Sequence, residues 1–169
     1  MERKILITGG VKSGKSRFAL EMARKLGEKT LFIATARPID AEIREKIERH
    51  KKERGKEFIT IEEPIKLAEA LKEATHLTAV IDCITLWLSN LFFELPDDQR
   101  EKEIKDFIET AREFKGYIIT VSNEVGWGII PENRLSRLYQ EELGMVNQKI
   151  ASICNEVYLL VSGIPLRLK

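Results

Sequence analysis

The clearest chemical signal in the sequence is a loop suited to binding phosphate. One segment satisfies the pattern GxxxxGK[ST] at every fixed position, and it consists of Gly9, Gly10, Val11, Lys12, Ser13, Gly14, Lys15 and Ser16. Its glycines allow backbone N–H groups to point at phosphate oxygens, beside the N-terminus of the helix that follows. Lys15 is expected to contact the β- and γ-phosphates, and Ser16 a magnesium ion. The segment therefore predicts a site for a nucleoside triphosphate with Mg²⁺.

Asp82 is the second candidate ligand for the magnesium ion. The run Thr78–Asp82 is apolar and ends in this carboxylate, which is typical of a buried strand in a parallel sheet. In enzymes with such a phosphate loop, an aspartate at this place holds Mg²⁺ beside the loop serine, usually through water. A strand-end aspartate is also a common turn former, but the neighbouring loop motif favours the magnesium interpretation.

His50 is the candidate nucleophile. It lies on a strongly charged helix expected over Ala41–Arg54, in which Ile43, Ile47, His50 and Arg54 form one stripe at helical spacing. Because the first half of this stripe is apolar, we expect it to face the sheet and to carry His50 to the protein side. An imidazole among cations can attack phosphorus, although a histidine near a helix end is more often only solvated or hydrogen-bonded.

Short apolar segments alternate with longer amphipathic ones along the chain, which is typical of a parallel sheet covered by helices. The expected strands are Lys4–Thr8, Thr30–Ala34, Glu57–Ile61, Thr78–Asp82, Gly116–Val121 and Glu156–Val161. The clearest helices are Lys15–Leu26, Ala41–Arg54, Ile65–Glu73, Asp98–Phe114 and Glu132–Ile153. A turn at 162–165 leads into a last strand at Leu166–Leu168.

These elements and the phosphate loop predict a single domain over residues 1–169. The fold class is α/β and P-loop NTPase-like (RecA-like): a mostly parallel sheet flanked by helices, with a C-terminal antiparallel edge strand. The segment Leu86–Phe93 is apolar nearly all round, so we expect a buried core helix there. A subunit interface or the wall of a site for a large apolar ligand are the alternatives for this helix.

Composition excludes several classes of function. The 28 Lys and Arg residues nearly balance the 27 Asp and Glu residues, so the chain has no broad positive field for nucleic acid or an anionic membrane. No apolar run approaches the roughly 20 residues of a membrane span. Cys83 and Cys154 lack the spacing of a metal or redox site, and we expect both to be buried. A cytoplasmic enzyme is the natural interpretation.

Two further groups are expected near the nucleotide because they follow strands. Glu62 could accept hydrogen bonds from a guanine edge or a ribose hydroxyl, although a surface glutamate at a strand end is the plain alternative. The loop Ser122–Gly128 contains Asn123, Glu124 and two glycines that permit close backbone approach to a substrate. We expect this loop at the active site, without assigning roles to its residues.

Taken together, these motifs resemble the bifunctional adenosylcobinamide kinase/adenosylcobinamide-phosphate guanylyltransferase family of cobalamin biosynthesis. The resemblance covers nearly the whole chain, and the segments that carry it are the phosphate loop, 33–36, the His50 helix, 82–88, 121–134, 147–148 and 160–166. It implies phosphorylation of adenosylcobinamide by ATP or GTP. It also implies transfer of GMP from GTP to adenosylcobinamide phosphate, through a guanylylated histidine and with release of pyrophosphate.

His50 occupies the position of that histidine, directly before a basic stretch that is implied to bind nucleotide. The other expected nucleotide contacts outside the phosphate loop are Ala34, Thr35 and Ala36 at the end of the second strand, Lys51, Lys52, Glu53 and Arg54 in the basic stretch, and Glu62 at the end of the third strand. The resemblance further implies a homotrimer, for which the Leu86–Phe93 helix is one candidate contact. Family members often carry Arg-Pro and then Trp after the basic stretch, whereas this chain has Arg54-Gly55 and Phe58, so local packing is expected to differ.

Two other functions are consistent with the phosphate loop alone. The first is a small-molecule kinase with no guanylyl transfer, in which His50 is structural. The second is a non-catalytic nucleotide switch or a nucleic-acid ATPase. The near-zero net charge disfavours a nucleic-acid substrate.

Overall fold

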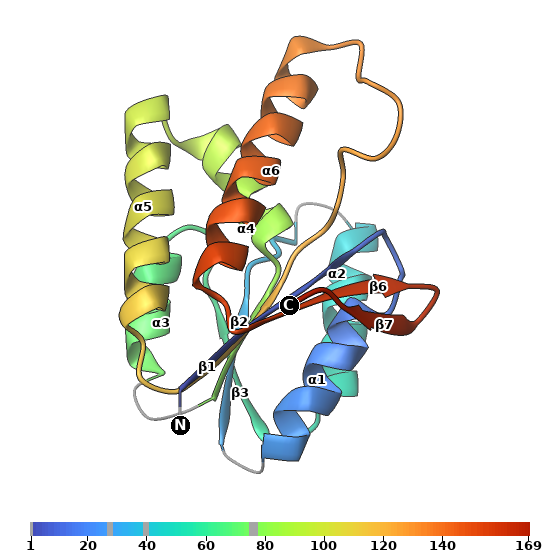
Figure 1. The fold of residues 1–169 in the computed structure, drawn as a ribbon, viewed down its shortest axis with the longest axis vertical. Helices are drawn as coiled ribbons and strands as arrows, with labels where there is room; N and C mark the ends of the chain where they lie inside the picture. The colour runs from blue at the N-terminus through green and yellow to red at the C-terminus, as the bar shows by residue number, and fades with distance from the viewer. Residues whose placement is uncertain (1, 27–28, 39–40, 75–77) are drawn as a thin grey trace.

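A single seven-stranded sheet with helices on both faces forms the molecule (Figure 1). The computed structural model describes residues 2–26, 29–38, 41–74 and 78–169, apart from the side chains of residues 42, 43, 46 and 53. The strands are β1 (Arg3–Gly9), β2 (Thr30–Ala34), β3 (Phe58–Glu62), β4 (Thr78–Asp82), β5 (Tyr117–Val121), β6 (Glu156–Val161) and β7 (Ile164–Arg167). The helices are α1 (Lys15–Leu26), α2 (Ala41–Arg54), α3 (Leu67–Glu73), α4 (Ile84–Glu94), α5 (Asp97–Glu113) and α6 (Arg134–Ile153).

The strand order is β3-β2-β4-β5-β1-β6-β7, and only β7 runs antiparallel to its neighbour. Strands β1 to β6 are parallel, so the loops after them emerge at one edge of the sheet. Strand β1, which leads into the phosphate loop, lies between β5 and β6. Ligands of open α/β sheets bind at this carboxyl edge. The expected fold class is confirmed.

Two apolar cores lie on opposite faces of the sheet, because successive side chains of a strand point to opposite sides. Ile5 and Ile7 of β1 pack in the core beneath α1, while Leu6 belongs to the core beneath α3 to α6. Figure 1 shows α1 and α2 on one side of the sheet and α3, α5 and α6 on the other. The site at the carboxyl edge thus receives groups from both layers.

Several expected element boundaries shift in the structure for local reasons. Helix α3 begins at Leu67 rather than Ile65, because the Glu63 carboxylate accepts the N–H groups of Ile65 and Lys66 at 2.8 and 2.7 Å in a turn. Helix α6 begins at Arg134 rather than Glu132, because Asn133 caps its first turn.

The edge strand is also shifted from its expected place. It spans Ile164–Arg167 instead of Leu166–Leu168, since the turn is tighter than expected. Ser162 and Gly163, with φ of 51° and 83°, complete the reversal, and Ile164 already pairs with Val161. Pro165 lies within this strand, as proline can at a sheet edge.

Helix α4 is only partly buried, which corrects the expectation for the Leu86–Phe93 segment. Trp87, Leu88 and Leu91 are fully buried, but Leu86 is 42% and Phe93 78% exposed. Neighbouring helices cover one side of α4 and leave the other open. Apolar composition all round the helix could not reveal which side that is.

Both cysteines are buried, as expected, and burial raises the pKa of each thiol to about 12. Neither is a reactive thiolate at neutral pH. Among the helices in the described ranges, none has the length and apolar character needed to cross a membrane.

Candidate active site at the phosphate loop

The phosphate loop is held by backbone contacts to the strands and turns beside it. Gly9 has a φ of 147°, and a Cβ there would collide with the carbonyl oxygen of Leu160 on β6. Gly14 has a φ of 97°, a conformation that favours glycine. The N–H of Gly163 donates to the Ser13 carbonyl oxygen at 2.9 Å. The loop conformation therefore depends on its glycines and on the β6–β7 turn.

Lys15 marks the phosphate position within the loop. Its buried ammonium donates to the Gly10 carbonyl oxygen at 2.5 Å and lies 3.4 Å from the Ser13 hydroxyl oxygen. Burial lowers the pKa of Lys15, and the negative charge of Asp82 partly opposes this. A buried cation that faces a loop of N–H donors is suited to bind phosphate oxygens.

Ser16 and Asp82 meet at the start of α1 and the end of β4. The Ser16 hydroxyl is hydrogen-bonded to the Asp82 carboxylate, and both residues line the same cavity. Burial raises the pKa of Asp82, while the Ser16 hydrogen bond and the nearby positive charges act in the opposite direction. A hydroxyl and a carboxylate are hard oxygen ligands of the kind that Mg²⁺ prefers, so this pair fits a magnesium ion.

His50 stands between two adjoining cavities. One, of about 130 Å³, is lined by His50 together with Ser16, Asp82 and Glu62, among others. The other, of about 490 Å³, runs along the phosphate loop from Lys12 to Arg17 and is again bordered by His50. His50 therefore borders both the space along the phosphate loop and the space beside Ser16 and Asp82.

The helical stripe around His50 is partly as expected. Arg54 is buried and Ile47 half-buried, but His50 itself is exposed to solvent while it borders the two cavities. Position 54 thus packs on Phe32 of the sheet, and position 50 borders the two cavities. Two expected members of this region, the Ile43 and Glu53 side chains, lie outside the described part of the chain.

Arg54 anchors the end of α2 to the sheet. Its guanidinium lies 4.1 Å from the centre of the Phe32 ring and donates to the His50 carbonyl oxygen at 3.0 Å. Burial lowers the pKa of Arg54. Phe58 packs edge-to-face on Phe32, with ring centres 6.4 Å apart, and thus supplies the aromatic group expected after the basic stretch. Arg54 holds the backbone of His50 in place.

Lys51 and Glu62 form an ion pair at the rim of the cavity, with 2.6 Å between Nζ and Oε1. This hydrogen bond raises the pKa of Lys51. Lys52 is exposed on the same helix end. In the basic stretch, Arg54 is therefore buried, Lys51 is ion-paired at the rim of the cavity and Lys52 is exposed to water.

The residues at the end of β2 also differ in whether they face the cavity or the protein interior. Ala34 and Ala36 line the smaller cavity, but Thr35 is buried and its side chain points into the protein. Its hydroxyl accepts the Cys83 N–H at 2.8 Å and donates to the Cys83 carbonyl oxygen at 2.7 Å. Asn90 of α4 donates to the Thr35 carbonyl oxygen at 2.9 Å. Thr35 thus joins the ends of β2 and β4, and it is not among the residues that line the smaller cavity.

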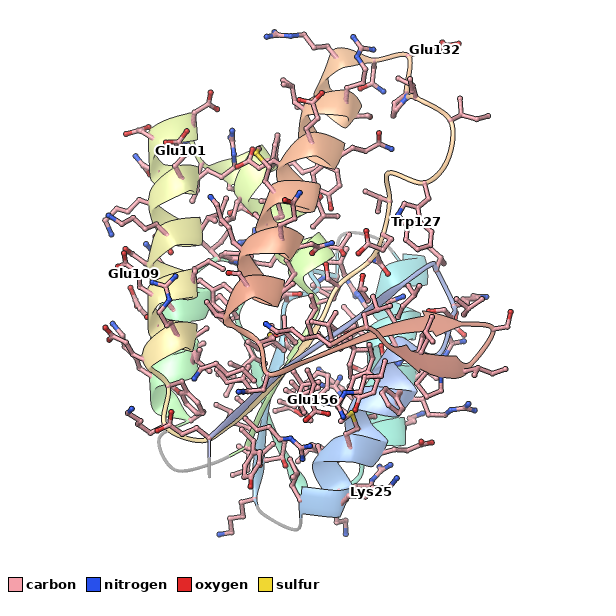
Figure 2. All side chains as sticks on the ribbon, viewed as in Figure 1. Lys25, Glu101, Glu109, Trp127, Glu132 and Glu156 are labelled. Carbon is pink, nitrogen blue, oxygen red and sulfur yellow. The ribbon has the colours of Figure 1, made fainter. Side chains whose placement is uncertain are left out.

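The loop after β5 adjoins the phosphate loop. The N–H of Glu124 donates to the Gly9 carbonyl oxygen at 3.2 Å, and the Thr8 hydroxyl donates to Glu124 Oε1 at 2.7 Å. The farther part of this loop turns outward: Trp127, labelled in Figure 2, is 70% exposed. The structure brings Glu124, and not the two glycines that follow, against the loop.

Sequence reasoning missed several residues of the site. Phe32, Ile47 and Leu86 line the smaller cavity, and Asn90 fixes the Thr35 segment. Their types are ordinary for strands and helices. The position of Phe32 on β2, two residues before Ala34 and therefore on the same face, is the one signal that could have identified it.

Solved structures that resemble this chain share its fold at low sequence identity. An ATPase from the type III secretion system of pathogenic bacteria superposes with a TM-score of 0.56 at 10% identity, covering 94% of this chain and 51% of the ATPase. The RadB recombinase superposes with a TM-score of 0.50 at 14% identity, covering 93% and 73%. These similarities support the P-loop NTPase-like fold alone.

Curated relatives match the chain over nearly its full length. The bifunctional adenosylcobalamin biosynthesis protein CobP of Pseudomonas aeruginosa is 41% identical, over 97% of this chain and 96% of its own. CobU proteins of the same description from Escherichia coli and Salmonella typhimurium are each 34% identical, over 98% of this chain and 99% of their own. The family model for cobinamide kinase / cobinamide phosphate guanyltransferase matches residues 5–168. The chain therefore belongs to the cobinamide kinase / cobinamide phosphate guanyltransferase family.

Proposed function

We propose that this protein catalyses two consecutive transfers of cobalamin biosynthesis. It phosphorylates adenosylcobinamide with ATP or GTP, and it then transfers GMP from GTP to adenosylcobinamide phosphate by way of a guanylylated His50. The observation that carries the second step is the position of His50, which borders both the cavity along the phosphate loop and the cavity that contains Ser16 and Asp82.

In guanylyl transfer, a ring nitrogen of His50 attacks the α-phosphorus of GTP. A nitrogen–phosphorus bond forms, the bond to the β-phosphate oxygen breaks, and pyrophosphate leaves. Lys15 and the backbone N–H groups of the loop stabilise the negative charge that develops on this leaving group. A phosphate oxygen of adenosylcobinamide phosphate then attacks the same phosphorus and displaces His50, giving adenosylcobinamide-GDP.

Ser16 and Asp82 would hold Mg²⁺ together with phosphate oxygens of the nucleotide. The ion supplies charge neutralisation at the phosphates when it is bound. The hydrogen bond between Ser16 and Asp82 keeps both oxygen ligands at one place in the cavity. Their carboxylate and hydroxyl chemistry supports this assignment.

The nucleotide would contact the backbone of Gly9 to Ser16 and lie against Ala34 and Ala36. Glu62 is suited to accept hydrogen bonds from the guanine base or the ribose, and its ion pair with Lys51 holds the carboxylate at the rim of the same cavity. Lys51 can contribute positive charge next to the phosphates.

A homotrimer is part of the same proposal, and the exposed side of α4 is its candidate contact. Leu86 and Phe93 are exposed there, and large exposed apolar side chains favour association. Light scattering coupled to gel filtration tests it: Phe93→Asp is expected to shift the mass toward the monomer. A wild-type protein that elutes as a monomer would contradict the trimer.

The test of the proposed function separates the two transfers. Purified protein is given adenosylcobinamide phosphate and GTP, and pyrophosphate release is followed for the wild type, His50→Asn and the control Arg49→Gln, an exposed neighbour on α2. We expect His50→Asn to lose at least about a thousandfold in rate and the control to stay near the wild type. Kinase activity on adenosylcobinamide is expected to survive in both variants.

Retention of guanylyl transfer in His50→Asn would exclude the histidine intermediate. A wild-type protein that phosphorylates adenosylcobinamide but releases no pyrophosphate from GTP would instead indicate a small-molecule kinase.

A further inference from the structure

We propose that Glu124 is the general base of the kinase step, taking the proton from the substrate hydroxyl that attacks the γ-phosphate. The inference rests on the proposed kinase function and concerns the side of the phosphate loop opposite His50. There, a carboxylate is held against the loop by a set of buried polar groups that guanylyl transfer does not use.

Two contacts tie Glu124 to the residues directly before the phosphate loop. Its N–H donates to the Gly9 carbonyl oxygen at 3.2 Å, and its carboxylate oxygen Oε1 accepts from the buried Thr8 hydroxyl at 2.7 Å. Both the backbone and the side chain of this residue are therefore fixed relative to β1. A small shift of the loop would be transmitted to the carboxylate.

A second layer of hydrogen bonds supports this arrangement. Asn147 of α6 donates to the Asn123 carbonyl oxygen at 3.1 Å and lies 3.5 Å from Glu124 Oε1. The Ser122 hydroxyl donates to Asn147 Oδ1 at 2.6 Å. Ser122 and Asn147 are 0% and 7% exposed. Buried and fully bonded networks of this kind hold a functional group in one orientation.

The hydrogen bonds to the Glu124 carboxylate all end on one oxygen. Within the described residues, Oε1 accepts the side-chain hydrogen bonds while Oε2 accepts none, and no lysine or arginine forms an ion pair with Glu124. The residue is half-buried. One oxygen thus positions the group, and the second can take a proton.

Glu124 lies closer to the expected position of the γ-phosphate than to that of the α-phosphate. Lys15 of a P-loop contacts the β- and γ-phosphates, and here its ammonium lies on the Gly10 carbonyl oxygen, next to the Gly9 that Glu124 contacts. His50 approaches from α2, over β2 and β4, whereas Glu124 emerges between β4 and β1. The two side chains therefore approach the triphosphate from different sides.

In the proposed step the substrate O–H bond breaks and its proton passes to Oε2 of Glu124. The hydroxyl oxygen forms a bond to the γ-phosphorus, the bond to the β-phosphate oxygen breaks, and the nucleoside diphosphate leaves. A positioned carboxylate accelerates such a transfer about 10²- to 10⁴-fold. Without the nearby acceptor, the attacking hydroxyl must give its proton to water.

The experiment uses Glu124→Gln, which keeps an oxygen acceptor for the Thr8 hydroxyl but removes the base. We expect kcat for phosphorylation of adenosylcobinamide to fall at least about a hundredfold. The rate of guanylyl transfer to supplied adenosylcobinamide phosphate should stay within about threefold of the wild type. Glu132→Gln, an exposed glutamate farther along the same loop, is the matched control and should leave both rates near the wild type.

A structural role for Glu124 gives different results. If Glu124 only closes the turn against Thr8, Glu124→Gln keeps that contact and the kinase rate is unchanged, which overturns the proposal. Equal loss of both transfers, together with a lower melting temperature, also overturns it. A wild-type enzyme that transfers GMP but does not phosphorylate adenosylcobinamide removes the kinase half of the proposed function and this inference with it, whereas an active wild type with an active Glu124→Gln removes only the inference.

Discussion

The two sides of the phosphate loop are built in different ways. On the α2 side, His50 is exposed and Lys51 pairs with Glu62 at the rim of the site. On the β5 side, Ser122 and Asn147 are buried and hydrogen-bonded, and they support Glu124. His50, Lys51 and Glu62 on the first side meet water, whereas Ser122 and Asn147 on the second side are part of the protein interior.

This difference fits the two proposed tasks. A histidine that receives GMP from one substrate and gives it to another must be reachable by both, which exposure allows. A carboxylate that takes a proton during a single transfer must be held in one place. We therefore expect substitutions on the α2 side to change activity alone, and substitutions on the β5 side to change stability as well.

The largest effect is expected at the residue that both sides share. Lys15→Ala should reduce kcat/KM of both transfers at least about a thousandfold, since this ammonium serves the β- and γ-phosphates in each reaction. Steady-state assays of the separate half-reactions measure the effect, with Lys25→Ala as control, since Lys25 is exposed on α1 and lines neither cavity. If one transfer survived in Lys15→Ala, the two reactions would not use the same triphosphate site.

The next largest effect is expected at Asp82, where a substitution should lower the activity but raise the stability of the protein. Asp82→Asn removes the proposed magnesium ligand and should reduce both transfers about a hundredfold. Burial raises the pKa of Asp82, so its ionised form destabilises the folded protein at neutral pH. Urea unfolding without nucleotide or metal should find the variant more stable than the wild type.

The sign of this stability change with pH follows from the raised pKa of Asp82. The folded protein binds the proton more readily than the unfolded chain does, so the wild type gains stability as the pH falls through the raised pKa. The difference in free energy of unfolding between Asp82→Asn and the wild type should therefore become smaller from neutral pH toward about pH 4. A difference in free energy of unfolding that grows on acidification would show that the folded protein stabilises the ionised carboxylate.

On the β5 side, Asn147→Ala should lower the free energy of unfolding by about 1–3 kcal/mol. The substitution leaves the buried Ser122 hydroxyl and the Asn123 carbonyl oxygen without their partner. It should also slow the kinase step more than guanylyl transfer, because Glu124 loses support. Urea unfolding and the two half-reaction assays test this, and a variant as stable as the wild type would contradict the view of this side as interior.

The smallest change in stability is expected on the α2 side, for Lys51→Ala. Because the Lys51–Glu62 ion pair is exposed to solvent, its loss should change the free energy of unfolding by less than about 1 kcal/mol. The KM for GTP in guanylyl transfer should nevertheless rise several-fold, while the kinase step changes little. A decrease in the free energy of unfolding as large as that of Asn147→Ala would contradict the difference in stability expected between the two sides.

Much of the framework of the site could be predicted from the sequence. The bounds of β2, β4, β6, α1 and α2 agree with the expected ranges, because turn residues and the change from apolar to amphipathic runs mark them clearly. The phosphate loop was recognisable because its chemistry is contained in consecutive residues. Its position between a strand and a helix followed from the same pattern.

The contacts that complete the site could not be predicted, because they join distant parts of the chain. Thr8 and Glu124 are separated by 116 positions, and Asn90 and Thr35 by 55. Nothing local distinguishes the buried Thr35 from the alanines on either side of it. The exposed side of α4 was missed for a related reason, since the neighbours of Leu86 and Phe93 are set by the packing of other helices.

The residue to which GMP becomes attached is the most direct test of the guanylylated His50. The protein is incubated with GTP, digested under alkaline conditions that preserve a phosphoramidate, and its peptides are analysed by tandem mass spectrometry. The expected result is one GMP on His50, which disappears when pyrophosphate or adenosylcobinamide phosphate is added before digestion. GMP on another residue, or guanylyl transfer that proceeds with no adduct on His50, would contradict the account.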